Sequence, residues 1–186
     1  MQKIINYSDF QKFFGTKKLP SIFLREIETN KLKYRDLSSN ENKKIFDLLK
    51  TTLKEKRLNK SGKKYKKKWN DGWNENLNLL KKKRENSLIP KYFNKYKYAR
   101  IGGKIYKTET NFFDYKLLKL ITSYIFIKYF KNSRNILEFG AGTGHNLVNL
   151  SRFNKSAKLH ALDWAQETKK ICDILKRDIK IEGHTF

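Results

Sequence analysis

A glycine-rich loop between two acidic residues is the segment of this sequence whose residue types and spacing could do chemistry. Glycines stand at alternate positions, Gly140, Gly142 and Gly144, Glu138 lies two residues before the first, and Asp163 lies 19 residues after the last. Because glycine has no Cβ, such a loop can turn tightly and a ligand can approach its backbone closely. The spacing predicts a nucleotide-type ligand, with Asp163 accepting hydrogen bonds from both ribose hydroxyls.

The residues around the loop restrict which kind of nucleotide it could bind. A dinucleotide fingerprint places its third glycine at position 145, where this chain has His145. Glu138 would repel a pyrophosphate but suits a cationic ammonium or sulfonium group. A nicotinamide-dependent enzyme is therefore disfavoured.

The elements that must position these residues alternate between strand and helix. Short apolar runs predict strands at 136–139 and 159–163 and the start of a third strand at 179, and helical periodicity predicts helices at 145–153 and 165–177. This order predicts an α/β fold, the start of a doubly wound parallel sheet of about three strands. In such sheets the ligand binds beyond the carboxyl ends of the strands.

Two stretches carry a resemblance to a known family. Glu-Phe-Gly-Ala-Gly-Thr-Gly, followed by Leu-His-Ala-Leu-Asp-Trp, resembles motif I and the second acidic motif of class I S-adenosylmethionine-dependent methyltransferases, over about residues 135–186. The resemblance implies a Rossmann-like fold and S-adenosylmethionine as cofactor, with the glycine loop at the methionine end, Asp163 on the ribose and Trp164 against the adenine. The cofactor-binding set that it implies is Glu138, Phe139, Gly140, Ala141, Gly142, Gly144, Asp163 and Trp164.

The family comparison also sets expectations for the rest of the chain. A helix predicted at 113–131 matches the helix that commonly precedes the family's first strand and closes over the cofactor. The family's sheet has seven strands, whereas this sequence stops at Phe186, in or just after the third. We therefore expect a truncated methyltransferase that lacks the catalytic residues and is itself inactive.

Each singled-out residue also has a simpler explanation. Asp163 could cap the helix that begins near Ala165, since Asp is a favoured N-cap. Cys172 lies on the apolar side of its predicted helix and is expected in the core, and His160 is expected to pack within a strand. His145 could touch a ligand, cap a helix or face solvent. No Cys–His cluster has metal-ligand spacing, so no metal is expected.

In the first two thirds of the chain, the sequence pattern predicts helices that are separated by turns. Ser38-Ser39-Asn40-Glu41 is typical of a capping box and starts a helix predicted at 41–57. Nine basic residues within 54–68 predict an exposed linker. Asp71-Gly72 predicts a turn whose flanking tryptophans anchor it to the core, and Gly102-Gly103 predicts a hairpin turn. We divide the chain into a mainly helical N-terminal region (1–60), a basic and aromatic accessory segment (61–112) and an incomplete cofactor-binding domain (113–186).

The charge of the chain argues only weakly for a nucleic-acid partner. The net charge is +25, and 35 of the 43 basic residues are lysine, although arginine is the better side chain for phosphate and guanine. Abundant Lys, Asn, Ile, Tyr and Phe are also the residues of AT-rich codons. The charge is concentrated in residues 1–134, with 35 basic and 12 acidic residues, against 8 and 6 in residues 135–186.

The methyl acceptor is expected to be a small molecule or a carbohydrate hydroxyl. Aromatic residues that could stack on a sugar are interleaved through the accessory segment: Trp69, Trp73, Tyr92, Tyr96 and Tyr98. The acceptor would be held in line with the sulfonium methyl group, and proximity would drive the transfer. The alternatives are an RNA methyltransferase that holds its substrate with the basic half, and a non-catalytic binding module.

Two further features bear on where the chain acts. The single cysteine excludes an internal disulfide framework and fits a reducing cytosol. The run Leu120 to Ile127 is far shorter than the roughly 20 apolar residues of a membrane-spanning helix. We therefore expect a cytoplasmic protein without a membrane partner.

Overall fold

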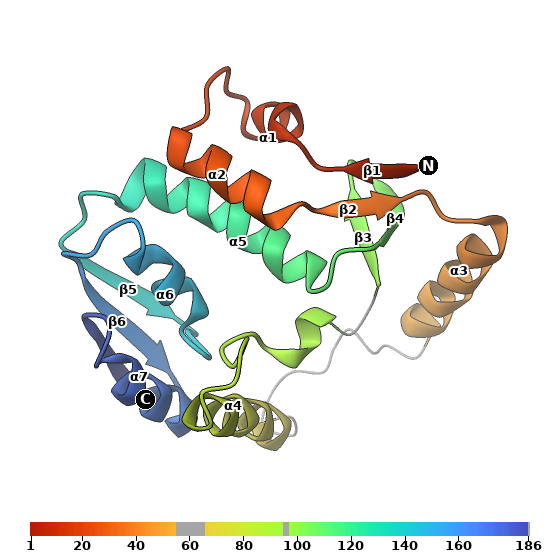
Figure 1. The fold of residues 1–186 in the computed structure, drawn as a ribbon. Helices are drawn as coiled ribbons and strands as arrows, with labels where there is room; N and C mark the ends of the chain where they lie inside the picture. Colours follow the sequence, from red (N-terminus) through yellow and green to blue (C-terminus); the bar gives the residue numbers. More distant parts are fainter. Residues whose placement is uncertain (55–65, 95–96, 186) are drawn as a thin grey trace.

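The computed structural model describes residues 1–54, 66–94 and 97–185 and shows a mixed α/β fold (Figure 1). The elements are, in chain order, β1 (Gln2–Ile4), α1 (Tyr7–Phe14), α2 (Ser21–Asn30), β2 (Lys33–Arg35), α3 (Ser39–Lys54), α4 (Lys66–Lys81), the 3₁₀ turn η3 (Lys91–Asn94), β3 (Tyr98–Ile101), β4 (Lys104–Thr108), α5 (Phe113–Ile125), the π-helical turn η4 (Phe126–Phe130), β5 (Asn135–Phe139), α6 (His145–Ser151), β6 (Lys158–Asp163), α7 (Gln166–Leu175) and β7 (Ile181–Thr185). No helix in these ranges is long and apolar enough to cross a membrane.

A four-stranded antiparallel sheet, in the order β1-β2-β4-β3, lies at one end of the molecule. The N-terminal region, predicted to be mainly helical, contains α1, α2 and α3 and in addition the short strands β1 and β2. These strands have only three residues each, too few for their alternation to stand out in the sequence. The predicted hairpin turn is confirmed: Gly102 and Gly103 both have positive φ and join β3 to β4, as a tight two-residue hairpin requires.

The first core is formed mainly by residues of α1, α2, α5 and the antiparallel sheet. α1 begins with a capping box in which the Asn6 side chain accepts from the amides of Ser8 and Asp9. Aromatic side chains of α1 and α2 pack against α5: Phe14 stacks on Tyr124 with ring centroids 3.8 Å apart. The buried members of this N-terminal core are Ile5, Phe10, Leu19, Phe23, Ile27, Leu32, Ala99, Phe113, Leu120 and Tyr124.

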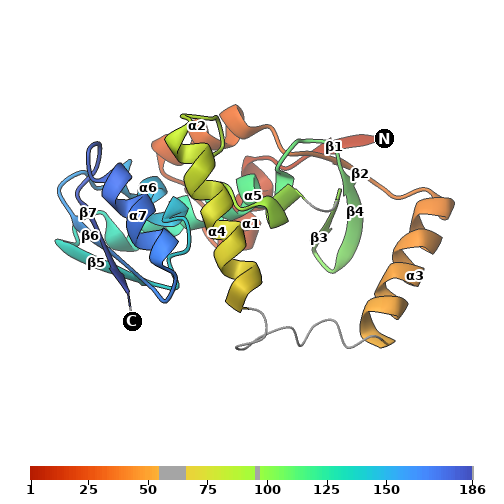
Figure 2. The same cartoon turned by 90° about the horizontal axis from the view of Figure 1, so that it is seen from below.

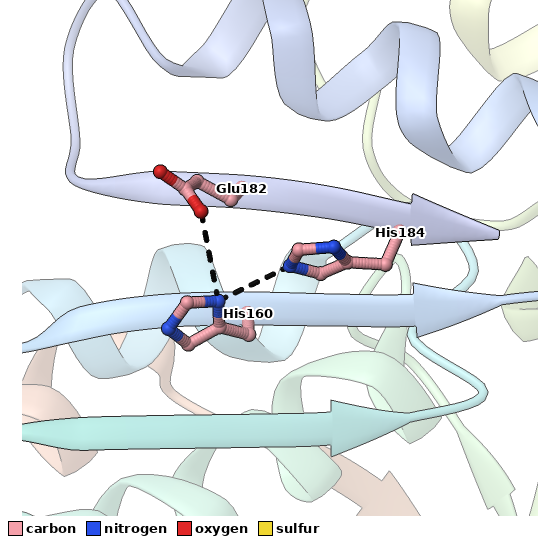
Figure 3. Close-up of side chains that lie close together, drawn as sticks. All are labelled: His160, Glu182 and His184. Atoms are coloured by element: carbon pink, nitrogen blue, oxygen red, sulfur yellow. Dashed lines mark hydrogen bonds and ion pairs between the residues drawn. The ribbon is translucent and has the colours of Figure 1, made fainter.

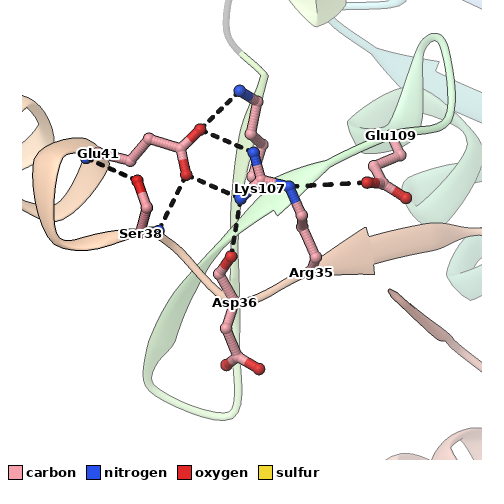
Figure 4. Close-up of polar contacts among 6 residues, drawn as sticks. All are labelled: Arg35, Asp36, Ser38, Glu41, Lys107 and Glu109. Carbon is pink, nitrogen blue, oxygen red and sulfur yellow. Dashed lines mark hydrogen bonds and ion pairs between the residues drawn. The ribbon is translucent and has the colours of Figure 1, made fainter. Parts of the chain in front are cut away.

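The predicted capping box at α3 is confirmed and extends into an ion-pair network (Figure 4). The Glu41 amide donates to Ser38 Oγ at 3.3 Å, and the Ser38 amide donates to Glu41 Oε2 at 3.0 Å. Arg35 binds both oxygens of Glu41 at 2.8 Å, and Lys107 Nζ lies 2.6 Å from Oε1. These contacts hold the pKa of Glu41 well below its usual range, and the hydrogen bonds from Arg35 have the largest effect. They tie the start of α3 to β2 and β4.

α4 corrects two sequence predictions. Asp71-Gly72 is not a turn: it lies inside α4, together with both tryptophans. Leu77 is buried in the core, and buried Asn76 donates to the carbonyls of Ser87 and Ile89, so tertiary packing holds a continuous helix here. The predicted basic linker is wrong for residues 66–68, which form the first turn of α4, while residues 55–65, with the end of the helix predicted at 41–57, lie outside the described residues.

The second sheet contains the glycine loop and is parallel, in the order β5-β6-β7. Figure 2 shows α6 and α7 beside it and α4 alongside α7. The buried residues of this C-terminal core are Leu77, Ile136, Ala141, Leu147, Leu150, Ala157, Leu159, Ala161, Ile171, Cys172, Leu175 and Ile181. The core position predicted for Cys172 is confirmed, and burial raises the pKa of its thiol to about 12. Each of the two cores contains residues from more than one of the three regions into which we divided the chain. The division into these regions stays a prediction.

α5 joins the two cores, and the helix predicted at 113–131 is confirmed as α5 continued by η4. Its residues Phe113, Leu120 and Tyr124 belong to the N-terminal core. On another side, buried Asn149 of α6 donates to Ser123 Oγ at 3.0 Å. This contact fixes α6, and with it the glycine loop, against the rest of the molecule.

Candidate functional site

The glycine loop turns the chain from β5 into α6 by left-handed backbone at each glycine. Gly140, Gly142 and Gly144 have φ of 72°, 55° and 69°. The Gly140 amide donates to the Leu162 carbonyl at 2.7 Å, and the Gly144 amide donates to Ala141 at 2.8 Å. Residues with a Cβ rarely adopt this conformation, so the spacing of the glycines in the sequence is the spacing that this turn needs.

Asp163 ends β6 next to the loop and is 3% exposed. Its Oδ2 accepts from the Gly142 amide at 2.8 Å, and its Oδ1 accepts from the Ala165 amide at 3.0 Å. Ala165 is the N-cap residue of α7, so the carboxylate lies just before the helix and accepts no amide within it. Asp163 thus connects the glycine loop to the turn between β6 and α7 at the carboxyl edge of the sheet. Each of its carboxylate oxygens retains a further lone pair that could accept from a ligand hydroxyl.

Glu138 presents an unsatisfied oxygen at the same edge. Its Oε1 accepts from Asn146 Nδ2 at 2.8 Å, whereas Oε2 is buried and has no hydrogen-bond partner within the described ranges. Burial raises the pKa of this carboxyl, and the Asn146 contact opposes the rise in part. A buried carboxylate oxygen without a donor is costly, and a cationic or hydrogen-bond-donating ligand group would satisfy it.

His145, the first residue of α6, is not solvent-exposed but faces into the protein. Its Nδ1 lies 3.1 Å from Thr143 Oγ1, and the Thr143 hydroxyl donates to the Leu88 carbonyl at 2.7 Å. Because the hydroxyl proton is used on Leu88, Nδ1 must be the protonated ring nitrogen and donate to Thr143. The other nitrogen, Nε2, is a buried acceptor without a partner among the described residues. Burial lowers the pKa of His145 to about 4, which keeps the ring neutral at pH 7.

α4 covers part of this edge. A Cβ built on Gly142 would lie 3.1 Å from the Trp73 ring, so this indole packs directly on the glycine loop. The Trp164 ring has Lys66 Nζ 5.3 Å from its centroid. Trp73 therefore covers the loop backbone at Gly142.

The predicted cofactor set divides into a cluster and two outlying residues. Glu138, the glycine loop and Asp163 lie together at the carboxyl edge, and Trp164 lies at the rim beside α4. Phe139 points to the opposite face of the sheet, where its side chain is 73% exposed. Strand alternation explains the separation, because Phe139 follows Glu138 directly.

A groove lies next to Trp73. Its volume is about 320 Å³, and Trp69, Gly72, Trp73, Glu75, Pro90 and Tyr92 are among the residues that line it. The tryptophan rings are 5.7 Å apart, and Tyr92 lies edge-on to Trp69. Three of the predicted sugar-stacking aromatics thus meet here, while Tyr98 belongs to β3 and Tyr96 lies outside the described residues.

Sequence reasoning missed several residues of these sites. Asn146 orients Glu138, and its position one residue after His145 was a usable signal, since the first turn of α6 must face the end of β5. His160 lies within strand β6 as expected, and its partly buried ring stacks on that of His184 in the neighbouring strand β7, a contact that the sequence analysis did not anticipate. The alternation Glu182-Gly183-His184 was its signal, because alternate strand residues share a face.

Comparisons with protein-family models, with curated proteins and with solved structures find no match to this chain. The arrangement of the site itself therefore carries the functional argument.

Proposed function

We propose that this chain binds S-adenosylmethionine at the carboxyl edge of β5 and β6, as the Rossmann-like cofactor half of a class I methyltransferase. The observation that carries the proposal is the convergence of Glu138, the left-handed glycine loop and Asp163 at one edge of a parallel sheet. Parallel α/β sheets bind their ligands at this edge, where loops rather than strands face the ligand.

Each group at the edge suits one part of this cofactor. The unsatisfied Glu138 Oε2 would accept from the ammonium of the methionine part, and the free lone pairs of Asp163 would accept from the ribose hydroxyls. Trp164 would lie along the adenine. When bound, the cofactor supplies a methyl group on a sulfonium sulfur. The residues of this chain bind and orient it.

We place the acceptor in the groove that Trp73 and Trp69 line. Its volume, about 320 Å³, is in the range of small-molecule sites, and its aromatic walls suit the flat apolar face of a sugar. Trp73 touches both the glycine loop and this groove, so an acceptor here would lie next to the proposed cofactor site. These features support a sugar or glycan hydroxyl as the acceptor.

The test is a thermal-shift and calorimetric titration of the whole chain with S-adenosylhomocysteine, using NAD as the control ligand. We expect saturable stabilisation by S-adenosylhomocysteine and none by NAD. Glu138→Gln should weaken binding by roughly tenfold or more, because a hydrogen bond to a charged group is worth about 1.5–3 kcal/mol. The matched control is Glu85→Gln, which removes an exposed carboxylate outside the proposed binding site.

Two results would overturn parts of the proposal. A cooperative melting transition that S-adenosylhomocysteine does not shift would refute the cofactor assignment and favour a non-catalytic binding module. If the chain binds RNA with an affinity that falls steeply between about 50 and 200 mM salt, and does not bind sugars, the glycan acceptor would have to be replaced by RNA. Trp69→Ala removes a wall of the groove and none of the side chains at the carboxyl edge, so it should weaken sugar binding and leave the S-adenosylhomocysteine titration unchanged.

A further inference from the structure

Three potential metal ligands, His160, Glu182 and His184, meet on one face of the parallel sheet (Figure 3). His160 of β6 pairs in register with Glu182 of β7, and His184 lies two residues further along β7. Alternate residues of a strand point to the same face, so the pairing places all three side chains on one surface. The helix-covered face holds Ala161 and Gly183 instead, where a Cβ on Gly183 would lie 2.9 Å from Cys172.

The donor atoms of these side chains converge. His160 Nδ1 lies 3.2 Å from His184 Nε2 and 3.9 Å from Glu182 Oε2, and the ligand atoms are all within 4.8 Å of one another. The two rings are close to parallel, at 28°. The Glu182 side chain is 56% exposed, so an ion could reach the cluster from solvent.

A hydrogen bond explains only part of this arrangement. One imidazole N–H can donate to the other ring at 3.2 Å, but the carboxylate at 3.9 Å then lies beyond hydrogen-bond distance. A divalent ion would use all three groups. Ligands about 2.0–2.1 Å from a tetrahedral zinc lie about 3.3–3.4 Å apart, close to the observed separation of the two nitrogens.

We propose that His160, Glu182 and His184 form a binding site for a divalent transition-metal ion, with zinc as the preferred occupant. Two imidazoles and one carboxylate are a ligand set that zinc takes, with a fourth position left for water or a substrate group. Imidazole nitrogen also suits copper, nickel and cobalt but not calcium or magnesium, which select oxygen. The site faces away from the glycine loop, so it does not depend on the function proposed above.

The experiment is a calorimetric titration of the whole chain with zinc chloride after removal of metals by EDTA, followed by NMR of the histidine rings. We expect one zinc per chain, with the ring resonances of His160 and His184 shifted and those of His145, buried behind Thr143, unchanged. Magnesium should give no binding. Shifts at His145 alone, or no saturable zinc binding, would overturn the proposal.

Variants separate this site from adventitious binding. His184→Ala and Glu182→Gln should each weaken zinc binding by about tenfold or more, since even second-shell changes cost about 10–100-fold. Glu85→Gln is the matched control and should bind zinc as the wild type does. Both altered side chains are exposed, so the melting temperatures in EDTA should stay equal to that of the wild type. Equal zinc affinity in all four proteins would refute the proposal.

Discussion

At the scale of single residues, two partly buried groups at the carboxyl edge of the parallel sheet, Glu138 and His145, have pKa values shifted in opposite directions. Glu138 has a raised pKa and His145 has a lowered one, and burial is the main cause of both. Each group favours its neutral form in the folded chain. Their contributions to stability therefore depend on pH in opposite directions.

Glu138 should make the folded chain less stable as the pH rises. Its pKa lies above the usual value of 4.5, so the folded chain binds this proton more tightly than the unfolded chain does. The contribution is fully present below pH 4.5 and is lost as the pH rises through the raised pKa. We expect Glu138→Gln to melt at the same or a higher temperature than the wild type at pH 7. A less stable variant at pH 7, with Glu85→Gln unchanged, would contradict this account.

His145 should act in the opposite sense. Its pKa falls from 6.5 to about 4, so between these values the unfolded chain binds a proton that the folded chain refuses. The stability that the neutral ring contributes is present above pH 6.5 and is lost as the pH falls through 4. An NMR titration of the His145 ring should give a midpoint near 4. A midpoint near 6.5 would show that the ring is solvated and not buried.

At the scale of elements, the structure explains why some local signals in the sequence predicted correctly and one did not. The capping box at Ser38 and the hairpin glycines act through contacts within a few residues, so the sequence alone specifies them. Asp71-Gly72 has an equally clear turn signal but lies in α4. There, burial of Leu77 and the contacts of Asn76 stabilise the helix more than one glycine destabilises it.

Gly142, which packs against Trp73, and Gly72, which precedes Trp73 in α4, should respond oppositely to alanine. Gly142→Ala should destabilise the chain by about 1–2 kcal/mol or more, because φ is 55° and the new Cβ would lie 3.1 Å from Trp73. Gly72→Ala, in the helix beside Trp73 and with open space around its Cβ, should stabilise it by up to about 1 kcal/mol. Urea denaturation measures both. Equal effects of the two changes would show that the loop does not adopt this conformation.

At the scale of the whole molecule, α5 connects two cores that belong to different sheets (Figure 1). Polar contacts at this junction lie both in the interior and nearer the surface. Asn149 of α6 is 4% exposed and donates to Ser123 of α5, and Arg152 pairs with Glu26 of α2 nearer the surface. Such contacts fix the orientation of the sheet that carries the glycine loop relative to the N-terminal core.

Asn149→Ala should therefore weaken the junction. The change leaves Ser123 Oγ without this donor in a buried place, and an unsatisfied buried polar group costs about 1–3 kcal/mol. We expect the free energy of unfolding to fall by this amount in urea. Asn78→Ala, at an exposed position of α4, is the control and should change stability little. A loss no larger for Asn149 than for Asn78 would contradict a structural role for the junction.

The sequence by itself determined the parallel unit: the strands, the glycine loop and the acids at its carboxyl edge all follow from periodicity and glycine spacing over short distances. Only the tertiary structure decided that Trp73 covers Gly142 and that His160 meets His184. Local patterns specify backbone conformation because sterics and hydrogen bonds act between near neighbours. Which distant surfaces meet depends on the burial of whole elements against one another, and no short stretch of sequence contains that information.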